Sequence, residues 1–162
     1  MPVEPIPSNY PRLMAYIVPR DAAAAIEFYT SVFGATERGR IPGPNNTIGH
    51  AELDLGGSVL MLADEPADRA MHPGYESPQG LGGTSFGFVL YVEDCDAAYQ
   101  RALDLGATSE SEPETKFYGD REARVRDPFG YIWSVMTHLE DVSPEEMAAR
   151  AAELTTQAEA TA

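Results

Sequence analysis

His50 and Glu52 are the pair of side chains whose types and spacing most directly permit chemistry in this sequence. They lie two residues apart, so on a β-strand both would point to the same face. An imidazole and a carboxylate on one face can bind a divalent metal or act as an acid-base pair. The pair lacks the third ligand that catalytic metal sites normally have. The alternative is structural: His50 hydrogen-bonds across the sheet and Glu52 lies at its rim.

A second group of polar side chains lies in segment 117–121, which reads Phe-Tyr-Gly-Asp-Arg. Tyr118, Asp120 and Arg121 supply a phenol, a carboxylate and a guanidinium next to a glycine that permits a tight bend. Glu52, Tyr118 and Asp120 are therefore candidates for acid-base catalysis. The alternative is a structural turn in which Asp120 caps backbone amides and Arg121 pairs with a nearby acid.

The elements that must position these groups occur twice along the chain. Residues 24–36 and 96–108 have apolar residues three and four apart and a glycine near the end, Gly34 or Gly106, suited to a left-handed helix C-cap. Each predicted helix follows a short apolar run and an aspartate that can cap it. The runs are 13–18 and 86–92, and the aspartates are Asp21 and Asp94.

A turn marked by glycine then joins two extended runs in each half. The paired runs are 48–55 with 58–63, and 122–127 with 131–137. Each half is thus a strand, a helix and two or three strands, which predicts an α+β fold of two similar modules. A small sheet with one helix on its back cannot bury both faces, so we expect two modules to pair around a cavity.

The remaining segments complete the predicted domain organisation. Residues 1–12 form an extended arm, 13–63 the first module, 64–83 a linker loop, 84–138 the second module, and 139–162 an acidic helix and tail. The linker is long for a structureless loop, so it is either mobile or a lid over the cavity. Ser143-Pro144-Glu145-Glu146 is a capping box, which predicts a helix running to about Leu154 and fraying in 155–162.

Composition restricts the class of protein. The 162 residues carry 26 acidic and 11 basic side chains, a formal charge of -15, which disfavours nucleic acid as a partner. No apolar run approaches the roughly 20 residues that a bilayer span requires, and the first residues lack the features of a signal peptide. The one cysteine, Cys95, excludes an internal disulfide. We expect a soluble, cytoplasmic protein with no membrane partner.

Several motifs resemble the vicinal oxygen chelate superfamily, which includes glyoxalase I, extradiol dioxygenases and bleomycin-resistance proteins. They are Phe28-Tyr29, Phe33-Gly34-Ala35, 48–53, 56–65, 117–121, Asp127-Pro128-Phe129-Gly130 and 137–147. The resemblance covers about residues 10 to 150 and is strongest to the bacterial glyoxalase/bleomycin-resistance-like branch. It implies paired βαβββ modules, the glyoxalase/bleomycin resistance/dioxygenase fold, with a C-terminal helix, usually in a homodimer.

The resemblance also implies where a metal would bind. Enzymes of the superfamily usually place four His, Glu or Gln ligands on the first and last strands of each module. Those positions fall here on Leu13 or Met14, Met61, Phe86 or Gly87, and Ser134. None is a suitable ligand for a hard or borderline divalent ion, so no cofactor is expected. A divalent metal relocated to His50 and Glu52 is the alternative.

Without these ligands, the cavity should be apolar and aromatic, suited to a flat apolar ligand. Its candidate ligand-binding residues are Met14, Tyr16, His50, Met61, Phe86, Phe88, Tyr118, Arg121, Trp133 and Ser134. For Trp133, one residue from the ligand position, the helix-facing side is the better prediction.

Three functions follow from this interpretation. The first is metal-free capture of a small molecule, such as an aromatic or cationic antibiotic, as the bleomycin-resistance proteins do. The second is a lyase, isomerase or dioxygenase of the glyoxalase kind, using metal or acid-base chemistry. The third is a non-catalytic dimeric interaction module that binds a partner through its acidic C-terminal helix.

Overall fold

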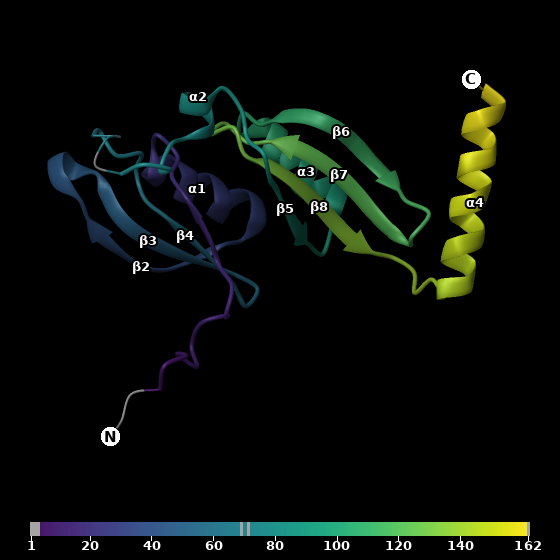
Figure 1. Cartoon of the computed structure of the whole chain (residues 1–162), viewed down its shortest axis with the longest axis horizontal. Helices are drawn as coiled ribbons and strands as arrows, with labels where there is room; N and C mark the ends of the chain where they lie inside the picture. The colour runs from purple at the N-terminus through teal and green to yellow at the C-terminus, as the bar shows by residue number, and fades with distance from the viewer. Residues whose placement is uncertain (1–3, 69, 71, 162) are drawn as a thin grey trace. The chain divides into compact units, whose positions relative to one another are not determined.

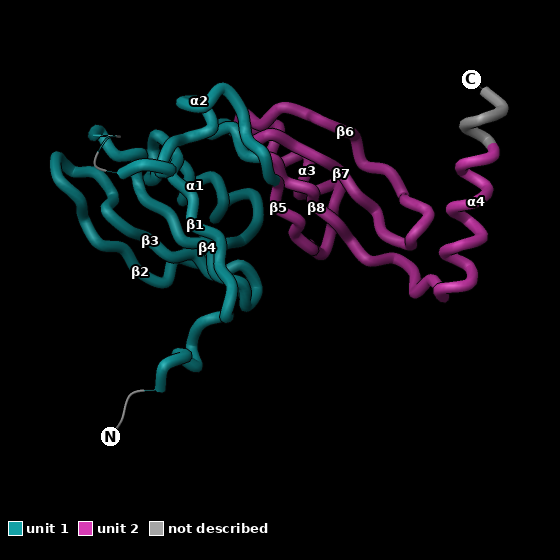
Figure 2. Tube along the Cα trace, in the orientation of Figure 1, with its two compact units in different colours: residues 1–86, 128–131 teal, residues 87–127, 132–162 magenta. Residues whose placement is uncertain are grey.

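The computed structural model divides the chain into two compact units, which Figure 2 colours separately. Unit 1 comprises residues 1–86 and 128–131, and unit 2 comprises residues 87–127 and 132–162. The structure describes residues 4–68, 70 and 72–161. The first three residues of the predicted arm, Arg69 and Met71 of the predicted linker, and Ala162 of the tail lie outside the described residues.

Unit 1 contains one complete βαβββ module (Figure 1). Its elements are β1 (Ala15–Ile17), α1 (Ala22–Phe33), β2 (Thr36–Pro42), β3 (Ile48–Leu55) and β4 (Ser58–Leu62), with a 3-10 turn at Pro44–Asn46 and a short helix α2 (Pro78–Leu81). The sheet order is β1-β4-β3-β2. β1 pairs with β4 in parallel, and the other pairs are antiparallel.

Unit 2 repeats this module and adds a helix. Its elements are β5 (Gly87–Tyr91), α3 (Cys95–Asp104), β6 (Thr108–Thr115), β7 (Asp120–Arg126), β8 (Ile132–His138) and α4 (Pro144–Thr161). The sheet order β5-β8-β7-β6, with β5 parallel to β8, matches that of unit 1. The predicted α+β fold with paired βαβββ modules and a C-terminal helix is confirmed.

Local chemistry sets the helix boundaries where the sequence predicts them. Asp21 and Asp94 accept hydrogen bonds from the amides of the third residues that follow them, at 2.8 and 2.9 Å. Gly34 ends α1 in the left-handed region with φ 69°. The Ser143 hydroxyl caps α4 by accepting from the amide of Glu146. However, α4 continues to Thr161 rather than ending near Leu154.

The segment predicted as a linker, 64–83, is part of unit 1 and contains α2. The turn at 128–131 also belongs to unit 1 although it joins two strands of unit 2. Its Phe129 packs edge to face against Phe28 and Tyr29 of α1, with ring centroids 6.1 Å apart. No helix in the described part of the chain is both long and apolar enough to cross a bilayer.

Each sheet has one face against its helix and one face away from it, which we call the distal face. In unit 1, Ala51, Leu53 and Leu62 are fully buried, whereas His50, Glu52 and Met61 alternate with them and lie on the distal face. In unit 2, Val125 and Val135 are fully buried beside α3, and Cys95 of that helix donates its thiol to the carbonyl of Val135. Glu122, Arg124 and Ser134 consequently share the distal face of the second sheet.

Gly119 is a position where only glycine fits. Its φ is +96°, and an added Cβ would overlap the carbonyl oxygen of Glu140. We expect Gly119→Ala to lower the free energy of unfolding by about 2–4 kcal/mol, through overpacking added to left-handed strain. Gly34→Ala is the matched control, because Gly34 also has positive φ but has nothing within 4 Å of an added Cβ. Urea denaturation followed by circular dichroism measures both, and equal losses for the two variants would contradict the packing argument.

Candidate functional site

Two cavities in unit 1 share a pair of tyrosines in their linings. The first has a volume of about 410 Å³ and the second about 520 Å³. Tyr16, Val18 and Tyr75 line both of them. The rings of Tyr16 and Tyr75 meet nearly perpendicular, with centroids 5.8 Å apart. Both tyrosines are more than 40% exposed, at 41% and 48%, so a ligand can reach them.

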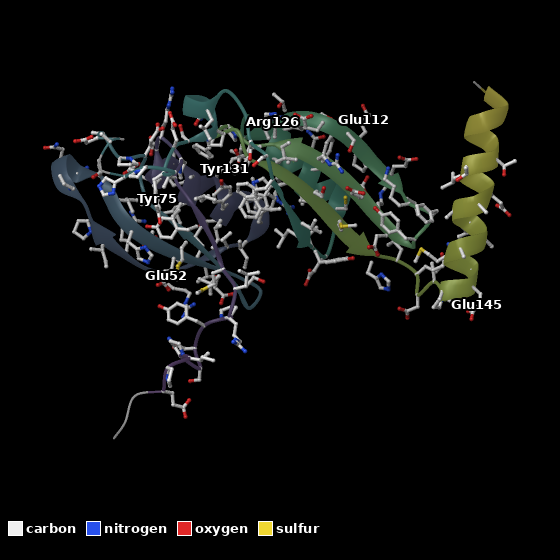
Figure 3. All side chains as sticks on the ribbon, in the orientation of Figure 1. Glu52, Tyr75, Glu112, Arg126, Tyr131 and Glu145 are labelled. Carbon is white, nitrogen blue, oxygen red and sulfur yellow. The ribbon has the colours of Figure 1, made fainter. Side chains whose placement is uncertain are left out.

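The first cavity is lined mainly by apolar and aromatic groups from β1, α2 and the 128–131 turn. Phe86 and Tyr131 pack against each other there, with ring centroids 6.0 Å apart. The hydroxyl of Tyr131 accepts a hydrogen bond from the amide of Val18 at 3.1 Å, which attaches the turn to the end of β1. Figure 3 labels Tyr75 and Tyr131 on unit 1.

Acidic side chains line the two cavities. Asp64, Glu65 and Asp68 line the second cavity and Glu76 lines the first, and no lysine or arginine is among the described lining residues. Because four acidic side chains and no lysine or arginine are among the described lining residues, we expect the cavities to favour a positively charged ligand.

Two of these carboxylates also hold the 64–83 segment in place. Asp64 accepts from the amides of Ala22 at 2.7 Å and Ile48 at 2.6 Å, which connects the segment to α1 and β3. Glu65 accepts from the amide of Ser77 at 2.9 Å and pairs with Arg20 at 3.4 Å. The walls of the cavities are therefore fixed by charge-assisted hydrogen bonds.

A chain of hydrogen bonds crosses the distal face of the first sheet and ends at Tyr16. The Tyr16 oxygen lies 3.3 Å from Nδ1 of His50, and Nε2 of His50 lies 3.3 Å from Oε1 of Glu52. Tyr10, from the N-terminal arm, donates its hydroxyl to the same carboxylate oxygen at 2.8 Å. The imidazole of His50 also stacks on the ring of Tyr16. Figure 3 labels Glu52.

Glu52 is held in its ionised form. The hydrogen bond from Tyr10, with those of His50 and the charge of Arg38, lowers the pKa of Glu52. Arg38 lies 3.7 Å from the second carboxylate oxygen, and its guanidinium stacks over the ring of Tyr10 at 4.6 Å. The Glu52 carboxylate is thus an acceptor in contact with Tyr10, His50 and Arg38.

The distal face of the second sheet carries a separate network. Tyr118 donates its hydroxyl to Glu122 at 2.6 Å, and Arg124 contacts both Glu122 and the hydroxyl of Ser134. Burial, followed by the hydrogen bond to Glu122, raises the pKa of Tyr118 well above its usual range. The predicted site residues Tyr118 and Ser134 therefore share one network.

Asp120 belongs to a neighbouring cluster. It accepts from the hydroxyl of Tyr91 at 2.6 Å and pairs with Nδ1 of His138 at 2.7 Å, while Nε2 of His138 lies 3.1 Å from Asp141. The hydrogen bond from Tyr91, reinforced by His138, lowers the pKa of Asp120. Asp120 is buried, so this cluster ties the end of β8 to the start of β7.

Three predicted binding residues lie on the helix-facing side of the second sheet. Arg121 forms a bidentate ion pair with Asp96 of α3, as in the structural alternative, rather than lining a cavity mouth. Trp133 is 2% exposed and donates its indole N–H to Asp127 at 2.9 Å. Phe88 stacks on Trp133 with ring centroids 4.3 Å apart, because the β5/β8 register places them opposite each other. We therefore leave these residues out of the site.

The two methionines lie beside the arm. Met14 and Met61 line a cavity of about 390 Å³ together with Tyr10, Pro11 and other residues of the arm. Met61 is paired with Tyr16 on one side and with Glu52 on the other. The arm is thus adjacent to the hydrogen-bond chain that leads to the two larger cavities.

Sequence reasoning did not find Tyr10, Arg38 or Tyr75. Tyr10 and Tyr75 lie in irregular segments without periodicity, and Arg38 lies on β2, whose register with β3 is broken by a bulge. Tyr10 is the one aromatic residue among the four prolines of the arm, and this contrast is the signal that could have drawn attention to it.

The residues present do not fit the metal that the fold implies. At the four expected positions, Met14, Met61 and Gly87 offer no nitrogen or oxygen side-chain ligand, Leu13 and Phe86 offer none either, and the hydroxyl of Ser134 already accepts from Arg124. Among the residues that the structure describes, no three His, Cys, Asp or Glu side chains lie together to hold an ion. His50 and Glu52 supply two possible metal ligands. Oxygen Oε1 of Glu52 already lies within hydrogen-bond distance of Tyr10 and His50.

Comparison with known proteins agrees with this fold. The model of the Glyoxalase/Bleomycin resistance protein/Dioxygenase superfamily matches residues 12–135, which spans both modules. The chain belongs to this superfamily. An uncharacterized protein of Mycobacterium bovis is 40% identical over 139 residues, which are 86% of this chain and 91% of that protein.

Two solved structures are similar to this chain in fold. A glyoxalase/bleomycin resistance protein/dioxygenase from Nocardioides aligns with a TM-score of 0.58 and 25% identity, over 88% of this chain and 90% of that one. An Arabidopsis thaliana gene product aligns with a TM-score of 0.61 and 27% identity, over 78% and 98%. Superfamily membership fixes the fold and leaves the ligand to the residues of the site.

The Asp120–His138 pair should make the free energy of unfolding depend on pH. Hydrogen bonds to Asp120 and then Asp141 raise the pKa of His138. A raised folded-state pKa contributes stability that is complete below the unfolded value of about 6.5 and is lost as the pH rises through the folded value. We expect His138→Gln to have a lower free energy of unfolding than wild type at about pH 5.5. This difference should be smaller at about pH 9. Urea denaturation at the two pH values measures this, and a pH-independent difference would refute it.

Proposed function

We propose that the protein binds an aromatic, cationic small molecule in the two cavities beside Tyr16 and Tyr75, without a metal ion. The observation that carries this proposal is the lining itself: exposed tyrosines next to four carboxylates, with no lysine or arginine among the described lining residues. Rings favour stacking with a flat ligand, and the carboxylates favour a positive charge on it. An antibiotic of this chemistry, sequestered without any bond being changed, is one such ligand.

The acid-base candidates support binding over catalysis. An efficient general acid or base has a pKa near the working pH. The pKa values of Glu52 and Asp120 are lowered from already acidic values, and that of Tyr118 is raised from an already basic one. All three are also engaged in hydrogen bonds within their own networks. Each shift moves the group away from neutral pH and so away from proton transfer.

Tyr75 provides the test of the ring contribution. We expect Tyr75→Ala to weaken binding of an aromatic ammonium such as 1-pyrenemethylammonium by roughly tenfold, because a stacking ring is lost. Tyr75→Phe keeps the ring and is the matched control, so its Kd should stay within about twofold of wild type. Fluorescence titration of the purified full-length protein measures all three. Unchanged binding in Tyr75→Ala would contradict the proposed location.

Metal independence is tested with the same probe. We expect the Kd of 1-pyrenemethylammonium to be the same before and after dialysis against a chelator, because carboxylates and rings hold the ligand. Adding back zinc, nickel or manganese should not change it. Loss of binding on chelation, restored by one of these ions, would favour the metal-dependent alternative at His50 and Glu52.

A further inference from the structure

The hydrogen bonds around His50 determine which way the hydroxyl of Tyr16 points. An ionised carboxylate only accepts hydrogen bonds, so the contact between Glu52 and Nε2 of His50 requires Nε2 to carry a hydrogen. A neutral imidazole has one N–H, so Nδ1 is then an acceptor. The Tyr16 oxygen is 3.3 Å from Nδ1. When the imidazole is neutral, Tyr16 therefore donates its only hydrogen to His50.

The contacts of Glu52, at the other end of the hydrogen-bond chain, fix the direction in which Tyr16 donates. Tyr10 donates to the same oxygen of Glu52 at 2.8 Å, and Arg38 lies 3.7 Å from the other oxygen. A proton on Glu52 would compete with both of these donors. The arm therefore keeps Glu52 an acceptor, and each group along the chain to Tyr16 donates toward Glu52.

We infer that Tyr16 offers its oxygen to the cavities only as a hydrogen-bond acceptor, and that the site selects organic cations bearing at least one N–H over quaternary ammonium ions. This inference rests on the proposed function and names the class of cation. The lone pairs of Tyr16 can accept from an ammonium or amidinium N–H of a ligand in either cavity.

The packing of the Tyr16 ring points the same way. A quaternary ammonium ion has no N–H and binds best over an uncovered aromatic face. The ring of Tyr16 is stacked on His50 at 5.7 Å and packed perpendicular to Tyr75 at 5.8 Å. The four carboxylates attract both kinds of cation through charge, and both oxygens of Asp64 and of Glu65 already hold partners. The acceptor oxygen of Tyr16 therefore adds a hydrogen bond that only the N–H cation can make.

The direction of the chain can be tested without any ligand. The ¹⁵N chemical shifts of the imidazole nitrogens separate the two neutral tautomers. The protein contains three histidines, so few signals need to be assigned. The signals of His50 are assigned by their absence from the His50→Gln variant. At alkaline pH we expect a protonated Nε2 and an unprotonated Nδ1. The reverse tautomer would overturn the inference.

Selectivity is tested with 1-pyrenemethylammonium and its N,N,N-trimethyl derivative, both of which are cationic and carry the same ring system. We expect wild type to bind the N–H form at least roughly tenfold more tightly, the effect of one hydrogen bond to a charged group. Tyr16→Phe keeps the ring and should reduce this difference by weakening the binding of the N–H form alone. Tyr75→Phe removes a different hydroxyl from the same cavities and should preserve the difference.

The outcomes separate the two claims. Equal affinity of wild type for the two probes, or an unchanged ratio in Tyr16→Phe, overturns the inference and leaves the proposed function standing. If wild type binds neither probe, the proposed function fails and the inference about ligand class fails with it. Circular dichroism of Tyr16→Phe distinguishes a local effect from a loss of folded protein. If Tyr16→Phe misfolds, His50→Gln takes its place. The ratio of the two probe affinities should be smaller in His50→Gln than in wild type.

Discussion

The carboxylate of Glu52 constrains the whole distal face of the first sheet. It is an ionised group that is only partly exposed, so it requires donors, and it obtains them from the arm and from its own strand. These donors connect Tyr10, Glu52, His50 and Tyr16 in one hydrogen-bond chain. Tyr16, at the end of this hydrogen-bond chain, lines both cavities, and a hydroxyl held in one direction is suited to orienting a ligand.

The duplicated modules use equivalent positions for different chemistry. The strand registers place Met61 between Tyr16 and Glu52 in the first sheet, and Ser134 between Val89 and Arg124 in the second. The acidic Glu52 thus corresponds to the basic Arg124. Backbone pairing is the same in both halves because it depends on hydrogen bonds common to all residues, whereas the side chains on the distal faces have diverged.

Repetition made most of the fold predictable. Asp21 and Asp94 cap their helices because a short carboxylate satisfies free amides wherever it occurs, and glycine turns close the hairpins for equally local reasons. The faces of the second sheet were harder to predict. Alternation groups Phe86 with Phe88 but does not say which face meets α3, and the partner of Arg121 lies 25 residues away at Asp96. Tyr75 and Tyr10 reach the site from irregular segments, where no periodicity marks a side chain's direction.

The most direct test of this account is a crystal structure of the protein grown with 1-pyrenemethylammonium, with anomalous data collected at the absorption edges of the first-row transition metals. The account predicts the pyrene ring beside Tyr16 and Tyr75, its ammonium group within hydrogen-bond distance of the Tyr16 oxygen, and no anomalous peak at His50 or Glu52. An ordered transition-metal ion bound to these two residues, with the ligand attached to it, would contradict the account.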